Sequence, residues 1–339
     1  LRYPESTIRK WRAESSDEHG NRHHLPGTGS PVIMSGPRLF GVMPGQWTPA
    51  IALADVLTNP CAVEVAGEKL AIFQDAEGAW HALLDRCPHR GAQLSRGRVM
   101  DDGSLRCAYH GWRFSGDGRC LRVPLNDLNE HALERIRATA IPARALAGAV
   151  WVYTGIEAPM QPALPASLQG PASQYGTYSQ EWQAHWTRAI ENFIDYAHPS
   201  YVHEDTIGAY TLRYAEGGAV AYSDVTPTEW GFHTINGMGR RGGGFRLDWY
   251  RPNLSVLHFG AGNEANLHVF AIPVNALQTR VMTVRRLGPE TDALDWSRRQ
   301  AGIDNVILSE DRAVVESQPG PVPDSGEEIS VATDAPSIA

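Results

Sequence analysis

The sequence predicts an α+β protein in which an antiparallel sheet packs against a long helix near the C-terminus. Six runs between residues 219 and 287 alternate apolar and polar side chains and are separated by turn residues, a pattern typical of antiparallel strands. Apolar residues then recur at helical spacing from residue 303 to 315. A segment rich in Cys and His lies well upstream, at 87–110, and the length of 339 residues is sufficient for two domains.

Composition narrows the class of protein. Hydrophobic residues make up 42% and charged residues 20%, which is normal for a chain with a proper core, and the net charge of -8 argues against nucleic acid as a partner. No apolar run approaches the length of a membrane span, and the first twenty residues hold no apolar signal segment. Four cysteines are too few for a disulfide scaffold. We therefore expect a cytoplasmic protein with no membrane partner.

The segment 87–110 carries candidate metal ligands in two short loops. Cys87 and His89 stand in the first loop, and Cys107 and His110 stand in the second. Two Cys and two His can close a tetrahedral zinc site, or they can hold a Rieske [2Fe–2S] cluster with the Cys on one iron and the His on the other. Zinc fingers group their Cys together and their His together. One residue of each kind per loop therefore favours the cluster.

These loops carry a family resemblance. CPHRGAQLSRG followed by CAYHGWRF resembles the Rieske signature of the Rieske non-haem iron oxygenases, and GDGRCLRVP after it is similar too. The resemblance implies an all-β Rieske domain over 45–155, with Cys120 structural rather than a ligand. It also makes residues 1–44 an N-terminal extension, which departs from the family. Soluble Rieske ferredoxins share the signature, so the loops alone leave a simple electron carrier open.

A second candidate centre lies at 186–208. Asn192, Asp195 and His198 are spaced by three, which predicts one polar stripe on a helix, and His203 follows at a step of five. Pro199 would distort the helix end and could aim both imidazoles at one ion; two ordinary His on an amphipathic helix are the alternative. The spacing N-x-x-D-x-x-H-x-x-x-x-H resembles the family's mononuclear-iron motif. That resemblance implies that the two His bind iron.

The same resemblance gives the other two residues separate roles. Asp195 is expected to bridge a Rieske His of one subunit and an iron-binding His of the next, and Asn192 is expected to lie beside the iron. A facial triad also needs a carboxylate. Asp311 and Glu310 both stand on the C-terminal helix, and an Asp paired with Arg312 or Arg298 is the structural alternative. This part of the helix resembles the family segment whose Asp binds iron, which implies that Asp311 is the third ligand.

The resemblance extends to the vanillate O-demethylase and dicamba monooxygenase branch. It implies that residues 156–339 form a mononuclear-iron catalytic domain, entered through a Pro- and Ala-rich linker at 156–180. The expected function is a terminal oxygenase that hydroxylates or oxidatively demethylates a small, ring-containing substrate with O2. The same irons could serve cis-dihydroxylation, desaturation or oxidative cyclisation. A Rieske electron-transfer protein without oxygenase activity is the alternative from another class.

Partners and pocket follow from the same reasoning. The sequence has no G-x-G-x-x-G fingerprint, so NAD(P)H is expected to act through a separate reductase, with or without a ferredoxin. The resemblance implies a homotrimer. Four arginines around the first loop could dock an acidic ferredoxin or form a solvated face: Arg86, Arg90, Arg96 and Arg98. Five residues could line the substrate pocket or belong to the core: Tyr196, Tyr201, Phe245, Trp249 and His258.

Overall fold

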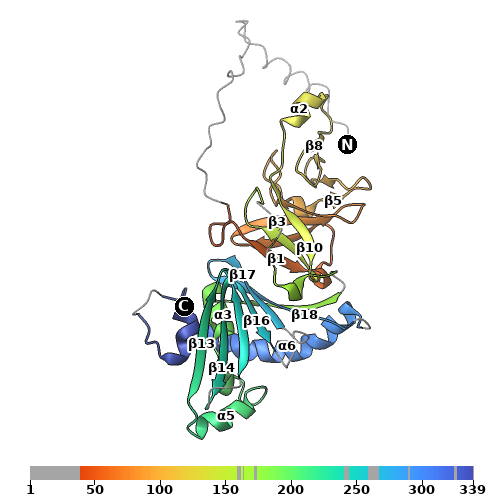
Figure 1. Cartoon of the computed structure of the whole chain (residues 1–339). Coiled ribbons are helices and arrows are strands. Elements are labelled where there is room, and N and C mark those ends of the chain that lie inside the picture. Colours follow the sequence, from red (N-terminus) through yellow and green to blue (C-terminus); the bar gives the residue numbers. More distant parts are fainter. Residues whose placement is uncertain are drawn as a thin grey trace. The chain divides into compact units, whose positions relative to one another are not determined.

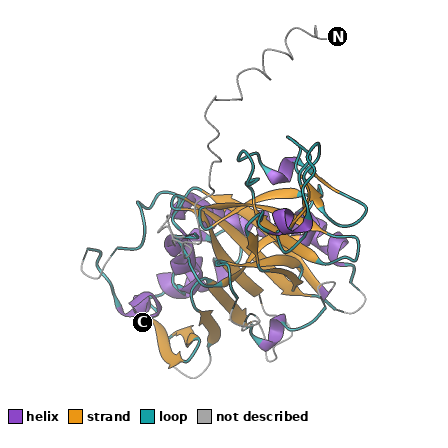
Figure 2. Ribbon diagram, turned by 90° about the horizontal axis from the view of Figure 1, so that it is seen from above, coloured by secondary structure: helices purple, strands orange, loops and turns teal. Residues whose placement is uncertain are grey.

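The computed structural model describes residues 39–158, 162, 164–171, 174–239, 244–258, 267–288, 291–323 and 327–338. The predicted N-terminal extension lies outside the described residues up to residue 38. Within the described part no helix is long and apolar enough to cross a membrane. More of these residues lie in strands than in helices, and the helices lie beside the strands (Figure 2).

The first part of the chain consists of three small antiparallel sheets (Figure 1). Two of them form a sandwich-like base: β1 (Trp47–Ala52), β11 (Ala149–Tyr153) and β10 (Ala143–Leu146) in one sheet, and β2 (Cys61–Val65), β3 (Glu68–Gln74), β4 (Trp80–Leu84) and β9 (Ala140–Ile141) in the other. The third contains β5 (Arg98–Val99), β6 (Leu105–Arg106), β7 (Arg113–Phe114) and β8 (Cys120–Arg122). Besides 3-10 turns, only the short helix α2 (Glu130–Glu134) interrupts this mostly β part among the described residues.

The second part is a seven-stranded antiparallel sheet in the order β12-β18-β17-β16-β15-β14-β13. Its strands are β12 (Tyr175–Trp182), β13 (Ala221–Thr228), β14 (Gly231–Met238), β15 (Phe245–Tyr250), β16 (Leu254–His258), β17 (Leu267–Asn275) and β18 (Gln278–Arg286). The helices are α3 (Trp186–Ile194), α4 (Pro199–Val202), α5 (Ala209–Glu216), α6 (Ala293–Val315) and α7 (Ala335–Ile338). The predicted α+β class and all six predicted strands are confirmed.

The two faces of this sheet are covered differently. One face packs under α3 and α6, where Phe193 and Leu308 share a buried cluster with Val269 and Val281 of the central strands. The other face continues into the core of the first part, where Phe270 and Met282 pack with Trp151 and its neighbours. Since successive strand residues point to opposite faces, the apolar runs of β17 and β18 are buried on both sides.

The chain departs from the sequence prediction at β12. We placed a linker over 156–180, but its last residues form the edge strand β12, which pairs along its whole length with β18. The segment YGTYSQEW lacks a strong apolar alternation, so its strand character comes from pairing and from α6, which contacts it through Tyr178 and Gln180. After α6 the chain continues into α7 and therefore does not end on the long helix.

The face of α6 also differs from the prediction. We expected Ile303, Ile307, Asp311 and Val314 or Val315 to share one face, but Ile303 is 58% and Val314 46% exposed. The buried positions are Asp304, Leu308, Asp311 and Val315. Asp304 is buried because the Thr283 hydroxyl donates to it at 2.9 Å and Arg285 lies 3.5 Å away. A polar residue with internal partners therefore replaces an apolar one at this turn.

His268 of β17 is a buried histidine with a fixed tautomer. Its Nδ1 lies 3.1 Å from the Val284 carbonyl, to which it must donate, so Nε2 accepts from the Ser167 hydroxyl at 2.7 Å. Burial lowers the pKa of His268 to about 4, against the weaker effect of the Val284 hydrogen bond. The neutral ring thus joins the segment before β12 to the sheet.

We predict that His268 makes folding stability fall on acidification. The unfolded chain binds this proton near pH 6.5 and the folded chain only near pH 4, so the unfolded state gains protons first as the pH drops through this window, a loss of up to about 3 kcal/mol. His268→Gln should flatten the decline in unfolding free energy between pH 7 and 4, measured by urea denaturation. The exposed His131→Gln is the control, and equal slopes in both variants would contradict the prediction.

Candidate metal centres

The two loops that carry Cys and His have the same backbone turn. In the first, the Gly91 N–H donates to the Cys87 carbonyl at 2.8 Å and the Cys87 N–H donates to the Ala92 carbonyl at 2.8 Å. The second repeats this pattern with Gly111, Cys107 and Trp112 at 3.1 and 2.8 Å. Both glycines have φ near +70°, the left-handed region that glycine adopts without strain. The sequence thus places one Cys at the start of each of two matching turns.

The four candidate ligands gather at one end of the first part of the chain. Cys87 and Cys107 are buried, His110 is exposed, and the rings of His89 and His110 lie 4.6 Å apart between centroids. Trp112 stacks on His89 at 4.4 Å with an interplanar angle of 4°. The tryptophan therefore fixes the orientation of one imidazole.

The donor set fits a two-iron cluster. The Nδ1 atom of His89 is buried and has no hydrogen-bond partner among the described residues. Burial raises the pKa of Cys87 to about 11, backed by the neighbouring Cys107, while the N–H groups of His89 and Arg90 act in the opposite direction. Cysteine thiols become thiolates when a metal compensates their charge. The four ligand atoms do not converge within 4.8 Å as a single zinc ion would require.

A second group of candidate ligands does converge. His198, His203 and Asp311 each offer one atom, and these atoms lie within 4.8 Å of one another. Asp311 Oδ1 is 3.4 Å from His198 Nε2 and 3.1 Å from His203 Nε2. The same Oδ1 is buried and accepts no hydrogen bond from the described residues. Two imidazole nitrogens and a carboxylate on one side of an ion are the donor set of a non-haem Fe(II) facial triad.

Carboxylates also hold the outer side of both rings. His198 Nδ1 lies 3.0 Å from Asp195 Oδ2, and His203 Nδ1 lies 2.7 Å from Glu310 Oε2. The Thr206 hydroxyl donates to the same Glu310 oxygen at 2.9 Å. Each contact requires the imidazole to donate from Nδ1, so Nε2 is the nitrogen that faces Asp311 and that could bind an ion once it is deprotonated. Both rings are therefore oriented as ligands before any ion binds.

The charges of this centre depend on each other. Burial lowers the pKa of His198, but the carboxylates of Asp195 and Asp311 outweigh it and raise the pKa to about 9. Burial raises the pKa of Asp311, yet His198 and His203 outweigh it and hold the pKa at about 2. In the metal-free protein the buried carboxylate is thus stabilised by imidazolium. A metal cation at the same place would take over that role while the rings bind it in neutral form.

The local backbone explains how these side chains meet. We predicted one helix carrying Asn192, Asp195 and His198, but α3 ends at Ile194 and Asp195 has extended backbone angles. The Asp195 carboxylate accepts from the backbone N–H groups of Ala197 and His198 at 3.1 and 2.7 Å, which turns the chain before α4 begins at Pro199. The break rotates His198 toward His203.

The structure also shows where Asn192 and four of the candidate pocket residues lie. The Asn192 amide nitrogen is buried on α3 without a hydrogen-bond partner among the described residues. Phe245 and Trp249 pack with Ile194 beside the centre. Tyr201 is 63% exposed, and His258 contacts Asp248 at 2.9 Å on the sheet face away from α3. Neither residue fits the predicted pocket wall. The role of Glu310 was missed, and its position directly before Asp311 was the available signal.

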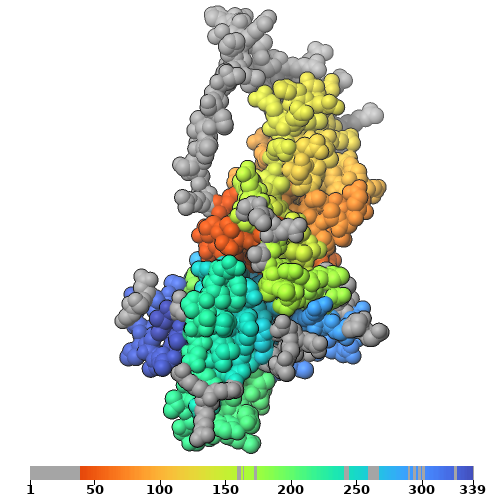
Figure 3. All heavy atoms as spheres, in the orientation of Figure 1, coloured from red at the N-terminus to blue at the C-terminus, as the bar shows by residue number. Residues whose placement is uncertain are grey.

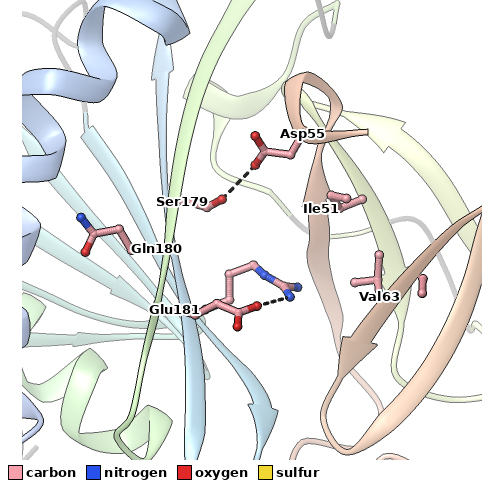
Figure 4. Close-up of a pocket in the computed structure, with 8 residues that line it drawn as sticks. Ile51, Asp55, Val63, Ser179, Gln180 and Glu181 are labelled. Atoms are coloured by element: carbon pink, nitrogen blue, oxygen red, sulfur yellow. Dashed lines mark hydrogen bonds and ion pairs between the residues drawn. The ribbon is translucent and has the colours of Figure 1, made fainter. Parts of the chain in front are cut away.

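A separate cavity of about 230 Å³ lies away from both centres (Figure 4). It is lined by residues of β1, β2, β12 and β18 and of the turn after β1, and it shares none with either ligand set. Arg280 is paired with Glu181 at 2.7 Å and donates to the Ala50 carbonyl at 2.6 Å, and the Ser179 hydroxyl donates to Asp55 at 2.9 Å. Its charged groups already have partners, so we assign it no catalytic role.

Fold and site together define a class of protein. Residues 46–132 match the Rieske [2Fe-2S] domain, and residues 182–339 match the vanillate O-demethylase oxygenase C-terminal domain. Both matches agree with the family resemblance seen in the motifs, a Rieske domain followed by a C-terminal domain of the vanillate O-demethylase oxygenase type.

Two curated relatives match part of the chain. The chain is 33% identical over 172 residues to the 3-chlorobenzoate-3,4-dioxygenase oxygenase subunit of Comamonas testosteroni, covering 50% of this chain and 39% of the relative. It is 37% identical over 147 residues to the vanillate O-demethylase oxygenase subunit of a Pseudomonas species, covering 42% and 43%. The matched regions thus span about two fifths of these relatives' own length.

Solved structures share the fold over most of the chain. NdmA of Pseudomonas putida CBB5 with caffeine superposes with a TM-score of 0.67 at 21% identity, covering 87% of this chain and 88% of that one. Dicamba monooxygenase bound to dicamba gives 0.63 at 20% identity, covering 87% and 95%. At this identity the likeness establishes the fold, and the reaction has to be argued from the site.

We predict that Glu310 strengthens iron binding through His203. Glu310→Gln keeps a side chain of the same shape but removes the charge that polarises the Nδ1–H bond, so bound Fe(II) should be lost about tenfold faster or more. The rate of iron transfer to a coloured chelator measures this. Glu316→Gln is the matched control, because Glu316 caps the C-terminal end of the same helix but contacts Arg312 and the Gln183 backbone. Equal rates of iron loss in the two variants would refute the role of Glu310.

Proposed function

We propose that the chain is a terminal oxygenase that receives electrons at Cys87, His89, Cys107 and His110 and uses O2 at His198, His203 and Asp311. The observation that carries the proposal is the presence of two separate donor sets in one chain, each with a buried acceptor atom that lacks a hydrogen bond: His89 Nδ1 and Asp311 Oδ1. When bound, the Rieske cluster supplies electrons and the mononuclear Fe(II) supplies the oxygen chemistry.

The protein's own residues prepare the second centre. Asp195 and Glu310 hold the Nδ1 protons of the two imidazoles, which keeps both Nε2 atoms available as ligands. Asp311 and His203 are each only 2% exposed, so water has little access from their side. Asn192 offers a buried amide on α3, one turn before Asp195, and we assign it a place beside the iron.

The proposed substrate is a small organic molecule with an apolar ring. Phe245, Trp249 and Phe232 pack with Ile194, the residue directly before Asp195, so an apolar surface adjoins the centre. Similar proteins carry names with ring compounds, among them vanillate and dicamba. We favour hydroxylation or oxidative demethylation. The dioxygenase and desaturase names among other relatives keep cis-dihydroxylation and desaturation as alternatives, with oxidative cyclisation as a further variant on the same irons.

Electrons are proposed to come from NAD(P)H through a separate reductase, directly or by way of a ferredoxin. The four cysteines are buried and free, which fits a reducing cytoplasm. A homotrimer is proposed because Asp195 could then bridge two subunits. Its side chain is 22% exposed and His110 is exposed, so both remain accessible to a second copy. Such a bridge would connect the cluster of one subunit to the iron of the next.

The count of iron atoms tests the proposal. Reconstituted protein should hold about three Fe per chain, whereas a Rieske carrier without oxygenase activity should hold about two. His198→Ala should lose one Fe and all turnover while keeping the Rieske absorption and EPR spectra. Cys107→Ser should lose the cluster spectrum. A colourless zinc protein, or an unchanged iron content in His198→Ala, would overturn the assignment.

Asp195 gives a separate prediction. Asp195→Asn keeps the size of the side chain but weakens its hold on His198 Nδ1 and any contact to a neighbouring subunit. Both iron centres should remain, while electron transfer from the reduced cluster slows by about a hundredfold or more, measured by single-turnover absorbance of the cluster. Normal single-turnover rates in this variant would refute the bridging role.

A further inference from the structure

The small sheet β5-β6-β7-β8, whose strands β6 and β7 flank the second cluster loop, carries an arginine ladder, consisting of Arg98, Arg106, Arg113 and Arg122. The strand register places Arg98 opposite Arg106, Arg106 opposite Arg113, and Arg113 opposite Arg122. Residues that pair across strands share a face, so the four side chains form one row over β5, β6, β7 and β8. The other face of the same sheet is apolar and buried, and consists of Val99, Leu105, Phe114 and Cys120.

This row of like charges is unfavourable for folding. Like charges directly opposite each other on a sheet repel. Arg113 alone has a charged partner, Asp102, and it also donates to the Ser104 hydroxyl at 3.0 Å. Within the part of the chain that the structure describes, no carboxylate lies within 4.0 Å of Arg98, Arg106 or Arg122, and all three are exposed. The fold itself does not account for the ladder.

Two other arginines of the same domain do have a carboxylate partner. Arg119 and Arg137 share Asp117, at 3.1 and 4.0 Å. The chain as a whole is acidic, with 38 Asp and Glu against 30 Lys and Arg. An uncompensated basic row on such a protein is therefore a local feature that favours an anionic partner.

The ladder lies beside the cluster ligands. Arg98 follows the first loop, Arg106 directly precedes Cys107, and Arg113 directly follows Trp112. Residues of these strands lie at the surface in Figure 3, in orange to yellow. The pairing of β6 with β7 encloses the second cluster loop, which carries the exposed His110, so the row and this loop belong to one small hairpin. Electron delivery needs a partner to approach the cluster ligands.

We propose that the arginine ladder is the docking surface for an acidic electron-donor protein of the ferredoxin type. The inference rests on the proposed function and refines the arginine set predicted from the sequence. Of that set, only Arg98 belongs to the ladder, and Arg96 already donates to Gln93 at 2.8 Å. Charge complementarity sets the partner: a negative surface would neutralise a row that the chain leaves unpaired.

The test uses the whole holoprotein and a plant-type [2Fe–2S] ferredoxin of negative charge as the probe. In the triple variant Arg98→Glu, Arg106→Glu, Arg122→Glu, the second-order rate constant for cluster reduction by this ferredoxin should fall about tenfold or more at low ionic strength. The rate should also lose its dependence on salt. Stopped-flow absorbance of the cluster measures both, before any oxygen chemistry takes place.

Two controls separate docking from other effects. Reduction by a small photoreduced flavin should be unchanged in the triple variant, because it needs no docking surface. Arg213→Glu changes the charge of an exposed arginine on α5 by the same amount per site and should leave the ferredoxin rate unchanged. An unchanged ferredoxin rate in the triple variant overturns the proposal, as does a change in molar mass by sedimentation, which would make the ladder a contact between copies.

The neutral variant Arg106→Gln tests for a merely structural role. It removes one repulsion, so the thermal midpoint should stay or rise while the ferredoxin rate falls severalfold. A lower midpoint with an unchanged rate overturns the proposal. Failure of the proposed function gives a different result, namely no Rieske spectrum or no third iron in the unaltered chain.

Discussion

Asp311 is a carboxylate held almost entirely out of water, 2% exposed, and its Oδ1 faces only the Nε2 atoms of His198 and His203, at 3.4 and 3.1 Å. A buried charge of this kind is costly unless a cation faces it. The imidazoles of His198 and His203 supply that charge in the metal-free protein, and a metal would supply it in the loaded one. The rest of the second centre is an arrangement for keeping two rings aimed at this one oxygen.

The position of Asp311 depends on how α6 lies against the sheet. Asn305 accepts from the Tyr178 hydroxyl at 2.9 Å and from the Gln180 amide at 3.0 Å, both on β12. One residue earlier, Asp304 accepts from Thr283 of β18. These contacts lie about two turns before Asp311 and fix the rotation of the helix, since i, i+3, i+4 and i+7 share a face. The edge strand β12 therefore contributes to the centre although it holds no ligand.

How much the sequence could predict depended on how local each feature is. The cluster loops were recognisable because each Cys and His pair lies within one tight turn, closed by a glycine. The third ligand was harder, because Glu310 and Asp311 stand 100° apart on one helix and both contact His203, at its two opposite nitrogens. Spacing could not separate a ligand from the residue that orients it.

Two other features could not be predicted from the spacing of apolar and polar residues. Helical spacing could not reveal the break at Asp195, which arises from a carboxylate binding its own backbone two and three residues on. Helical spacing put Ile303 on the inner face, because it cannot anticipate that Asp304 accepts from Thr283, a hydroxyl donor 21 residues away on β18. In each case a hydrogen bond to a polar side chain, and not the spacing of apolar residues, determined the local structure.

The two-sided character of β5 to β8 has an implication for how such proteins diversify. One face of these very short strands assembles the metal-binding turns, and the other meets the solvent. Under the docking proposal, substitutions on the outer row would change the choice of electron donor and leave the inner row, which packs below the cluster loops, intact. Few changes, at Arg98, Arg106 and Arg122, would then be enough to match such a protein to another donor, which an engineer could attempt on this scaffold.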